Sequence, residues 1–351
     1  MTIQENVPLA PYTTFHIGGP ARYFTEAHTE DDIHKLISFA RARRLPLFVL
    51  GGGSNLLVPD EGVEAVVIRM MLSGIDISHS DESIQITAGA GVPWNALVDA
   101  AAAQGVFGIE NLAGVPGTIG GAVVQNIGAY GAALSDTFTY ADAIDLHTGE
   151  RHRLTRDECK FGYRDSLFKH DRTLLIVSAT FSFPTAKDTA VNLSYRDPDK
   201  RYKDLEHLLD DNQRASPAEI AEAIRKIRSE KFPDLSKEGT AGSFFSNPIL
   251  SRAEATELQK RFPGLPLFPL PETTGVKIPI GWILDNVLHL RGYERGAARV
   301  YERHALVIAT RIGATASDVE ELARDITEKV RSATGILLER EVETFGTVTT
   351  Q

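Results

Sequence analysis

The chain lacks several features that would place it in common protein classes. Its 351 residues contain a single cysteine, Cys159, so no disulfide can form within the chain and nothing indicates an oxidising compartment. No stretch approaches the ~18 consecutive apolar residues of a membrane-spanning helix. The first residues, MTIQENVPLAPYTTFHIGG, lack the basic-then-apolar pattern of a signal peptide. We therefore expect a cytoplasmic protein without a membrane span.

Positive charge is also in deficit. Lysine and arginine total 37 against 47 aspartates and glutamates, which gives a net charge of −10 and argues against a nucleic-acid partner. Any anion must then be bound by local backbone donors and a few placed cations. The ten histidines form no H-x-x-x-H or H-E-x-x-H pair, so no metal site is expected.

What the sequence does contain is typical of a soluble enzyme or binding protein of two or three domains, with 42% apolar and 24% charged residues. The front of the chain alternates short apolar runs with glycine turns. We expect strands at 45–50, 63–70, 84–88 and 173–183, a helix between Pro93 and Gly105, and a hairpin around Thr148-Gly149.

The second half is richer in helix signals. Capping boxes beginning at Ser216, Ser251 and Ser317 each predict a helix start, and Gly335 predicts the end of the third helix. A final strand is expected over 336–346, whereas 186–215 reads as an irregular excursion. The fold class is therefore expected to be α+β.

A run of three glycines, in LGGGSNLLVPDEG at residues 50–62, needs a backbone explanation. It is not a dinucleotide-binding G-x-G-x-x-G motif, because Leu56 occupies the third glycine position and no helix pattern follows. It is not a P-loop either, because no Gly-Lys-Ser/Thr follows. Taken alone, this run favours a hairpin turn.

A second cluster, NLAGVPGTIGGAVVQNIGAYG at residues 111–131, holds six glycines. Successive backbone N–H groups in such loops form concave anion sites. Two such loops in an acidic chain suggest a phosphorylated cofactor held by main chain, although glycine-rich turns between strands would leave the same pattern.

Several segments together resemble the UDP-N-acetylenolpyruvoylglucosamine reductase family of bacterial peptidoglycan synthesis, flavoenzymes with the vanillyl-alcohol-oxidase (PCMH-type) FAD-binding fold. They are the two glycine clusters and TFHIGGPA (14–21), YRDSLFK (163–169), AGSFFSNP (241–248) and LEREV (338–342). The resemblance implies a two-subdomain FAD-binding region and a smaller α+β substrate-binding domain. Its parts would be 1–70, rejoined by 335–351, then 71–232 and 233–334.

The same resemblance implies a chemistry. NADPH would reduce non-covalent FAD, and UDP-N-acetylglucosamine enolpyruvate would then be reduced to UDP-N-acetylmuramate. The positions that match the cofactor-binding segments are Gly51, Gly52, Gly53, Ser54, Asn55, Leu56, Gly114, Gly117, Thr118, Gly120, Gly121, Asn126 and Gly128.

Three positions match the family's catalytic residues: Arg164 to stabilise an enolate, Ser243 to donate a proton to it, and Glu341 near the same carbon. From the residues alone, each also fits a structural role. Arg164 could pair with Asp165, Ser243 and Ser246 are equal candidates, and Glu341 could belong to a solvated acidic strand face.

Substrate binding is expected from Tyr202, Lys231, Asn247 and His304. Tyr195 competes with Tyr202, and His304 stands where the family pattern has glutamine, so its role is open. Two other functions remain as hypotheses: an FAD-dependent oxidase of a small alcohol, and a non-catalytic nucleotide-binding protein.

Overall fold

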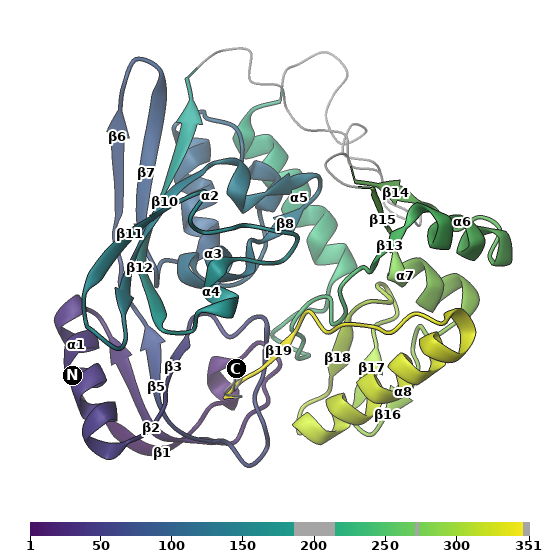
Figure 1. Ribbon diagram of the computed structural model, residues 1–351, viewed down its shortest axis with the longest axis horizontal. Coiled ribbons are helices and arrows are strands. Elements are labelled where there is room, and N and C mark those ends of the chain that lie inside the picture. Colours follow the sequence, from purple (N-terminus) through teal and green to yellow (C-terminus); the bar gives the residue numbers. More distant parts are fainter. Residues whose placement is uncertain (186–214, 271–273, 347–351) are drawn as a thin grey trace. The chain divides into compact units, whose positions relative to one another are not determined.

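The computed structural model describes residues 1–185, 215–270 and 274–346 (Figure 1). The chain folds into two compact units. Unit 1 comprises Met1–Val7, Ala21–Gly52 and Glu64–Arg228, and unit 2 comprises Pro8–Pro20, Gly53–Val63 and Ser229–Gln351. The division into three functional parts stays a prediction.

The first sheet of unit 1 has four strands in the order β1 (Gln4–Pro8), β2 (Pro20–Ala27), β5 (Val63–Met70) and β3 (Leu47–Leu50). β3 and β5 are parallel, so residues 51–62 between them must cross from one end of the strands to the other. The helix α1 (Glu30–Arg43) connects β2 to β3. The buried face of α1 contributes Ile33 and Leu36 to the same core as Val66 and Ile68 of β5. Periodicity alone had not predicted α1, although Thr29 and Asp32 form its capping box.

The second sheet of unit 1 has five antiparallel strands in the order β11 (Arg151–Thr155), β10 (Phe138–Asp145), β12 (Leu174–Pro184), β7 (Ser83–Gly89) and β6 (Ile75–His79). The predicted strands at 84–88 and 173–183 are confirmed as β7 and β12. The predicted hairpin is confirmed as β10 and β11, with Gly149 at φ +79° in its turn. Glycine adopts this left-handed conformation without the Cβ clash of other residues.

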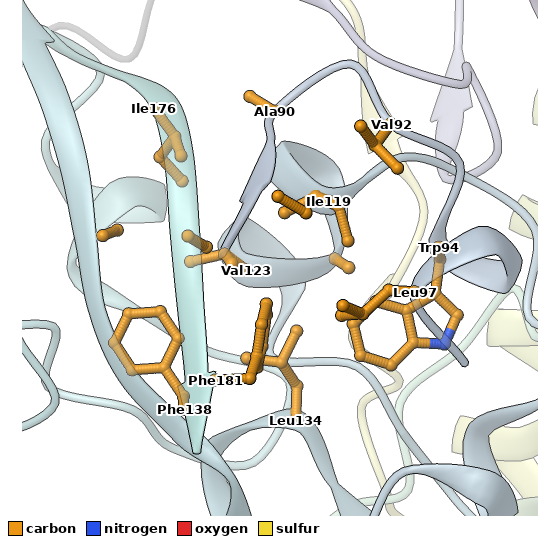
Figure 2. Close-up of a cluster of buried hydrophobic side chains, with 14 of the residues drawn as sticks. Ala90, Val92, Trp94, Leu97, Ile119, Val123, Leu134, Phe138, Ile176 and Phe181 are labelled. Carbon is orange, nitrogen blue, oxygen red and sulfur yellow. The ribbon is translucent and has the colours of Figure 1, made fainter. Parts of the chain in front are cut away.

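Short elements cover this sheet in unit 1. They are α2 (Trp94–Ala103), η2 (Glu110–Leu112), α3 (Ile119–Gln125), β8 (Gly128–Ala129), β9 (Ala132–Ala133), η3 (Leu134–Asp136) and α4 (Leu167–His170). Figure 2 shows the core beneath them, where Trp94, Ile119 and Val123 point toward Phe181 of β12. Trp94 and Phe181 meet edge to face, with ring centroids 6.0 Å apart. The second glycine cluster is therefore anchored on a close-packed apolar base.

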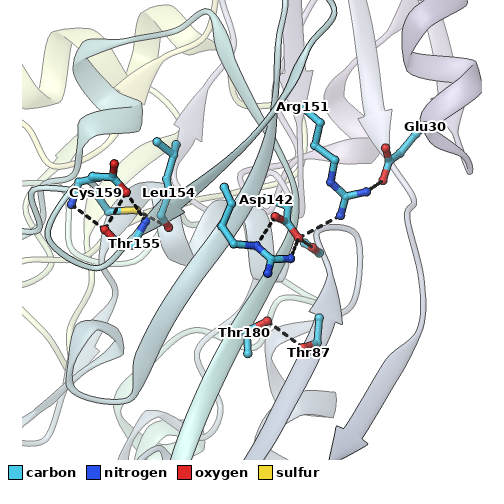
Figure 3. A network of polar contacts seen from close by, with 11 residues as sticks. Glu30, Thr87, Asp142, Arg151, Leu154, Thr155, Cys159 and Thr180 are labelled. Atoms are coloured by element: carbon cyan, nitrogen blue, oxygen red, sulfur yellow. Dashed lines mark hydrogen bonds and ion pairs between the residues drawn. The ribbon is translucent and has the colours of Figure 1, made fainter.

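A polar network crosses β10 and β11 (Figure 3). The buried carboxylate of Asp142 accepts hydrogen bonds from Arg151 and Arg153, and Arg151 also contacts Glu30 of α1 at 2.8 Å. Burial acts to raise the pKa of Asp142, but the two arginines outweigh it and hold that pKa below its usual value. The network joins the helix of the first sheet to the second sheet within unit 1.

Unit 2 gathers its chain from three places in the sequence. The N-terminal pieces supply η1 (Ala10–Tyr12) and β4 (Leu56–Leu57). The remainder contains α6 (Arg252–Arg261), α7 (Ile280–Trp282), the π-helical turn η5 (Ile283–Val287), α8 (Ala316–Thr334) and two three-stranded sheets. One sheet has the order β13 (Ile249–Ser251), β15 (Gly275–Lys277), β14 (Phe268–Pro269), and the other β16 (Glu294–Arg295), β17 (Ala298–Val300), β18 (Ile308–Thr310). The helix α5 (Pro217–Lys231) begins in unit 1 and ends in unit 2.

Two capping boxes are confirmed, at Ser216 before α5 and at Ser251 before α6. The third was placed wrongly: α8 begins two residues earlier, with Thr315 as N-cap and Asp318 as its partner. The pairs Thr315/Asp318 and Ser317/Glu320 both fit the Ser/Thr-x-x-acid pattern, so the sequence allowed two overlapping capping boxes. Gly335 does end the helix, in the left-handed conformation at φ +82°.

The final strand is also wrong as predicted. Only Glu343–Thr344 forms a strand, β19, which pairs in parallel with β4, and Arg340 makes an isolated bridge to Phe245. The backbone before β19 bonds to several different segments, among them Phe244, Ser246 and Asn55, so it does not form one regular strand. Among the helices of the described ranges, none combines the length and apolar content needed to cross a membrane.

Candidate functional site

The two glycine clusters meet within unit 1. A Cβ on Gly52 would lie 2.7 Å from the Cα of Gly117, and a Cβ on Gly51 would lie 2.7 Å from Thr118 Oγ1. Both distances are far shorter than ordinary van der Waals contact. At Gly52 the neighbour is backbone, so no side chain fits there, whereas at Gly51 the side chain of Thr118 would have to move. The backbone of the triplet therefore packs directly against the second cluster.

Two adjacent glycines of α3 have different surroundings. A Cβ on Gly120 would lie 3.2 Å from the Cβ of Ala90, so Gly120 allows the helix to pack closely. A Cβ on Gly121 would meet only Thr118 Oγ1, at 3.9 Å. Glycine in a helix is less favourable than alanine by about 1 kcal/mol. At Gly121 the packing within the protein does not require glycine, so close approach of a ligand would explain why glycine occupies this position.

Side chains from the start of α2 hold the second cluster in place. Asn95 accepts a hydrogen bond from the amide of Gly114 at 2.6 Å and donates one to the carbonyl of Val115 at 2.9 Å. Next to it, the indole N–H of Trp94 donates to the carbonyl of Leu112 at 3.0 Å. Sequence reasoning missed Asn95, because an asparagine at the start of a helix does not reveal which loop it will contact.

The loops suit a phosphorylated cofactor. Within the part of the chain that the structure describes, the amides of Gly52 and Gly53 donate no hydrogen bond. Backbone amides without an acceptor in the protein usually find one in water or a ligand. Within unit 1, the amide of Gly52 and the open space at Gly121 fit a diphosphate approached by main chain.

Arg164 occupies a tight turn of unit 1, with a left-handed backbone at φ +56°. The turn is closed by reciprocal backbone bonds between Gly162 and Asp165, and the guanidinium of Arg164 donates to the carbonyl of Gly128. The carboxylate of Asp165 instead contacts the ring of His170, at 2.9 Å. The turn therefore directs the Arg164 side chain onto the second glycine cluster.

A second arginine of unit 1, Arg228 on α5, belongs to the same surroundings and was missed by sequence reasoning. A Cβ on Gly114 would lie 3.0 Å from the Cδ of Arg228. Burial lowers the pKa of Arg228, Tyr130 acts against that through its charge and a hydrogen bond, and the charge of Arg164 lowers it further. The guanidinium nevertheless stays charged. Two nearby guanidinium groups favour an anion between them.

The triplet ends in unit 2, where Gly53 has φ +61° and a Cβ on it would lie 2.1 Å from the carbonyl oxygen of Tyr12. The N-terminal motif TFHIGG (14–19) holds this glycine in place, because the amide of Thr14 donates to the carbonyl of Gly53 at 3.0 Å. The hydroxyl of Thr14 also donates to the carbonyl of Thr240 at 2.6 Å. The N-terminal motif TFHIGG thus ties the glycine loop to the segment that leads into Ser243.

Ser243 and Glu341 lie at neighbouring backbone positions in unit 2. Ser243 bridges to Val307, and the amide of Glu341 donates to the carbonyl of Phe244 at 2.9 Å. The side chain of Asn55 donates to the carbonyl of Glu341 at 3.1 Å, and both Ser243 and Glu341 are half-buried. The structure thus brings together two predicted catalytic residues and Asn55 from the cofactor loop. Ser246 is also half-buried, so burial does not separate it from Ser243.

Three of the four predicted substrate residues lie in described parts of unit 2, whereas Tyr202 and its competitor Tyr195 lie outside the described residues. Lys231 is 8% exposed, and the neighbouring ring of Phe232 lies 5.3 Å from that of His304. The Nδ1 of His304 accepts the amide of Leu306 at 3.3 Å, so in the neutral ring the proton is on Nε2.

Asn247 has a structural contact, since its Oδ1 accepts the amide of Ile280 at 2.9 Å. No cluster of three or more histidine, cysteine, aspartate or glutamate side chains that could hold a metal occurs in the ranges described. Cys159 is buried, and burial raises the pKa of its thiol to about 12, so it stays protonated.

Two parts of the chain match known protein families. Residues 21–155 match the family described as "FAD binding domain", and residues 234–345 match "UDP-N-acetylenolpyruvoylglucosamine reductase, C-terminal domain". The protein is therefore an FAD-containing oxidoreductase.

Close relatives are reductases of one kind. The UDP-N-acetylenolpyruvoylglucosamine reductase of Pseudomonas syringae is 36% identical over 343 residues, covering 97% of this chain and 98% of the relative. That of Pseudomonas aeruginosa is 38% identical over 346 residues, with the same coverage. The solved structure of the Thermus caldophilus enzyme aligns with a TM-score of 0.67 at 26% identity, over 98% of this chain and 99% of that one. The chain belongs to the UDP-N-acetylenolpyruvoylglucosamine reductase family.

Proposed function

We propose that this protein reduces UDP-N-acetylglucosamine enolpyruvate to UDP-N-acetylmuramate, with FAD as cofactor and NADPH as hydride donor, in peptidoglycan precursor synthesis. The observation that carries the proposal is the match to reductases of this name over 97% of the chain. The two reactants, a nicotinamide nucleotide and a UDP-sugar, further suggest a cytoplasmic location. When bound, FAD would supply the two-electron redox chemistry that links NADPH to the enolpyruvyl group.

The glycine loops are proposed to hold FAD without a covalent link. Main-chain donors of Gly52 and Gly53 would bind the diphosphate, and Gly121 would let the cofactor approach α3 closely. Ser54, Asn55 and Leu56 continue the first loop. The remaining positions are proposed to shape the cradle rather than to bind through side chains: Gly51, Gly114, Gly117, Thr118, Gly120 and Gly128.

Arg164 is proposed to stabilise the negative charge that develops on the substrate. An enolpyruvyl group carries a carboxylate on one carbon of its double bond. A hydride added to the terminal carbon forms a C–H bond and breaks the π bond, and the electron pair moves to the carbon that bears the carboxylate, which delocalises it as an enolate. A guanidinium suits both groups because it is always charged and can donate two parallel hydrogen bonds. The nearby charge of Arg228 would strengthen the same electrostatic preference.

Ser243 and Glu341 are proposed to complete the reduction. Ser243 would donate a proton to the enolate carbon, and Glu341 would lie near the same carbon. A serine hydroxyl is a weak acid and needs neighbours that stabilise its alkoxide or relay a proton. The backbone bond between Glu341 and Phe244 supports this pairing, because it keeps Glu341 beside the residue that follows Ser243.

Lys231, Asn247, His304 and Tyr202 are proposed to contact the substrate. Lys231 is the candidate for the diphosphate, because a nearly buried ammonium favours an anionic neighbour. His304 would present an Nε2–H donor to the substrate if the ring stays neutral.

A single anaerobic titration tests the proposal. The visible absorbance of the purified protein is recorded alone, after NADPH, and after UDP-N-acetylglucosamine enolpyruvate. We expect the flavin band to bleach with NADPH and to return with the enolpyruvyl substrate. A band that returns only with air would favour an oxidase. A band that does not bleach with NADPH would exclude NADPH as the hydride donor and contradict the proposal.

A further inference from the structure

The side chain of Asn126 makes hydrogen bonds within the protein through both its amide nitrogen and its oxygen. Asn126 follows α3 as its C-cap, has a left-handed backbone at φ +41°, and is 6% exposed. Its Nδ2 donates to the carbonyl of Gly162 at 2.7 Å, and its Oδ1 accepts the amide of Ser135 at 3.1 Å. One carboxamide therefore bonds two backbone segments that are well separated in the sequence.

One of those segments is the turn that carries Arg164. Gly162 is the first residue of that turn, so the bond from Asn126 holds the turn at its start. The residue after the turn is held in a similar way, since the hydroxyl of Ser166, which is 0% exposed, donates to the carbonyl of Val124 at 2.7 Å. The two side-chain bonds flank Arg164 and both connect to the chain around the end of α3.

The backbone of Arg164 itself needs such support. A non-glycine residue with φ near +56° occupies a sparsely populated conformation that persists where its surroundings impose it. The guanidinium then reaches Gly128, two residues after Asn126. The position of the charged group is thus determined by the same segment that Asn126 fixes.

We propose that Asn126 is a positioning residue for Arg164, holding the turn that places the guanidinium, rather than a residue that binds the cofactor. The inference rests on the proposed function, because it requires Arg164 to act when the enolpyruvyl substrate is reduced. It replaces the prediction from sequence that Asn126 belongs to the cofactor-binding set.

Asn126→Asp is the sharpest variant, because it keeps the shape and the oxygen that accepts Ser135. It replaces the amide donor by an oxygen that repels the Gly162 carbonyl. Asn95→Asp is the matched control, since Asn95 makes the same kind of double contact with the second glycine cluster. Ser166→Ala removes the other bond of the turn and serves if Asn126→Asp does not fold.

Three quantities are measured for each variant: the dissociation constant of FAD, the rate of flavin reduction by NADPH, and the rate of reoxidation by the enolpyruvyl substrate. For Asn126→Asp and Ser166→Ala we expect the first two to stay within about twofold and the third to fall by ~10- to 100-fold, the usual effect of a misplaced catalytic group. Asn95→Asp should instead weaken FAD binding.

A double variant tests whether Asn126 acts through Arg164. In an Arg164→Lys background, Asn126→Asp should slow reoxidation by less than about twofold further, because residues that act as a unit are not additive. An undiminished effect in that background would overturn the inference, as would an FAD dissociation constant raised more than about tenfold by Asn126→Asp. If the substrate fails to reoxidise the wild-type flavin, the proposed function itself fails, and the inference with it.

Discussion

Gly121→Ala should raise the stability of the FAD-free protein and lower its affinity for FAD. In the structure, the added Cβ meets only Thr118 Oγ1, at 3.9 Å, which is ordinary contact. Alanine favours a helix over glycine by about 1 kcal/mol. Since α3 has only seven residues, we expect a gain of roughly 0.5–1 kcal/mol in the free energy of unfolding of the FAD-free protein.

The effect on FAD binding should have the opposite sign. If the cofactor fills the space beside Gly121, the new methyl group overpacks that contact, which typically costs about 1–3 kcal/mol. At about 1.4 kcal/mol per factor of ten, FAD affinity should fall by roughly 5- to 150-fold. The same atom would thus stabilise the free protein and destabilise the complex.

The assay pairs urea unfolding of the FAD-free protein with a flavin fluorescence titration. Gly120→Ala is the control, because its Cβ would lie 3.2 Å from the Cβ of Ala90 and should destabilise the FAD-free protein itself. FAD affinity unchanged by Gly121→Ala would refute the reasoning that a ligand approaches this glycine. A loss of stability in the FAD-free Gly121→Ala protein would refute the open space on which the prediction depends.

Four further predictions concern the remaining site and the fold. Arg164→Ala should leave flavin reduction by NADPH near normal and slow reoxidation by the enolpyruvyl substrate by ~10²–10³-fold, measured by anaerobic stopped flow; equal slowing of both steps would point to a folding defect. Ser243→Ala should slow the same reoxidation by ~10²–10⁴-fold, whereas Ser246→Ala should not, and the reverse result would exchange their roles. Lys231→Met, which keeps the apolar stem of the side chain, should raise the KM for substrate and NADPH with a smaller change in kcat. Unchanged KM values would exclude the proposed contact between Lys231 and the diphosphate. The pKa of Asp142 is lowered in the folded state, so the stabilisation by its carboxylate is present above the unfolded pKa of about 3.9 and is lost as pH falls through the folded pKa. Asp142→Asn should therefore lower the free energy of unfolding by about 1–3 kcal/mol at about pH 7 and change it little at low pH. Urea unfolding at both pH values measures this difference.

Local signals predicted much of the fold. The run at 63–70 forms β5 with the expected bounds, and the serine-to-glutamate pairs at Ser216 and Ser251 cap their helices. Each depends on residues a few positions apart. The segment 336–346 could not be predicted in this way, because its hydrogen-bond partners are Phe244, Asn55 and Leu57, which are distant in sequence.

The candidate site shows the same limit. Composition identified both glycine clusters, but it could not separate Gly120, which packs on Ala90, from Gly121, which does not. Nor could it tell that the asparagine in QNIGAYG bonds the turn of Arg164. Residue type gives the chemistry that is possible at a position, whereas the partner across the fold decides which chemistry is used.

The way unit 2 is assembled has a consequence for the growing chain on the ribosome. Thr310 bonds to Phe15 across 295 positions, and Asn55 bonds to Glu341 across 286. The first glycine loop is therefore synthesised early but lacks the partners of its second half until almost the whole chain has emerged. Contacts so distant in sequence form slowly. Before then, Phe15, Ile17 and Leu57 have none of the later core residues to pack against. Exposed apolar side chains of this kind make a nascent chain prone to aggregation.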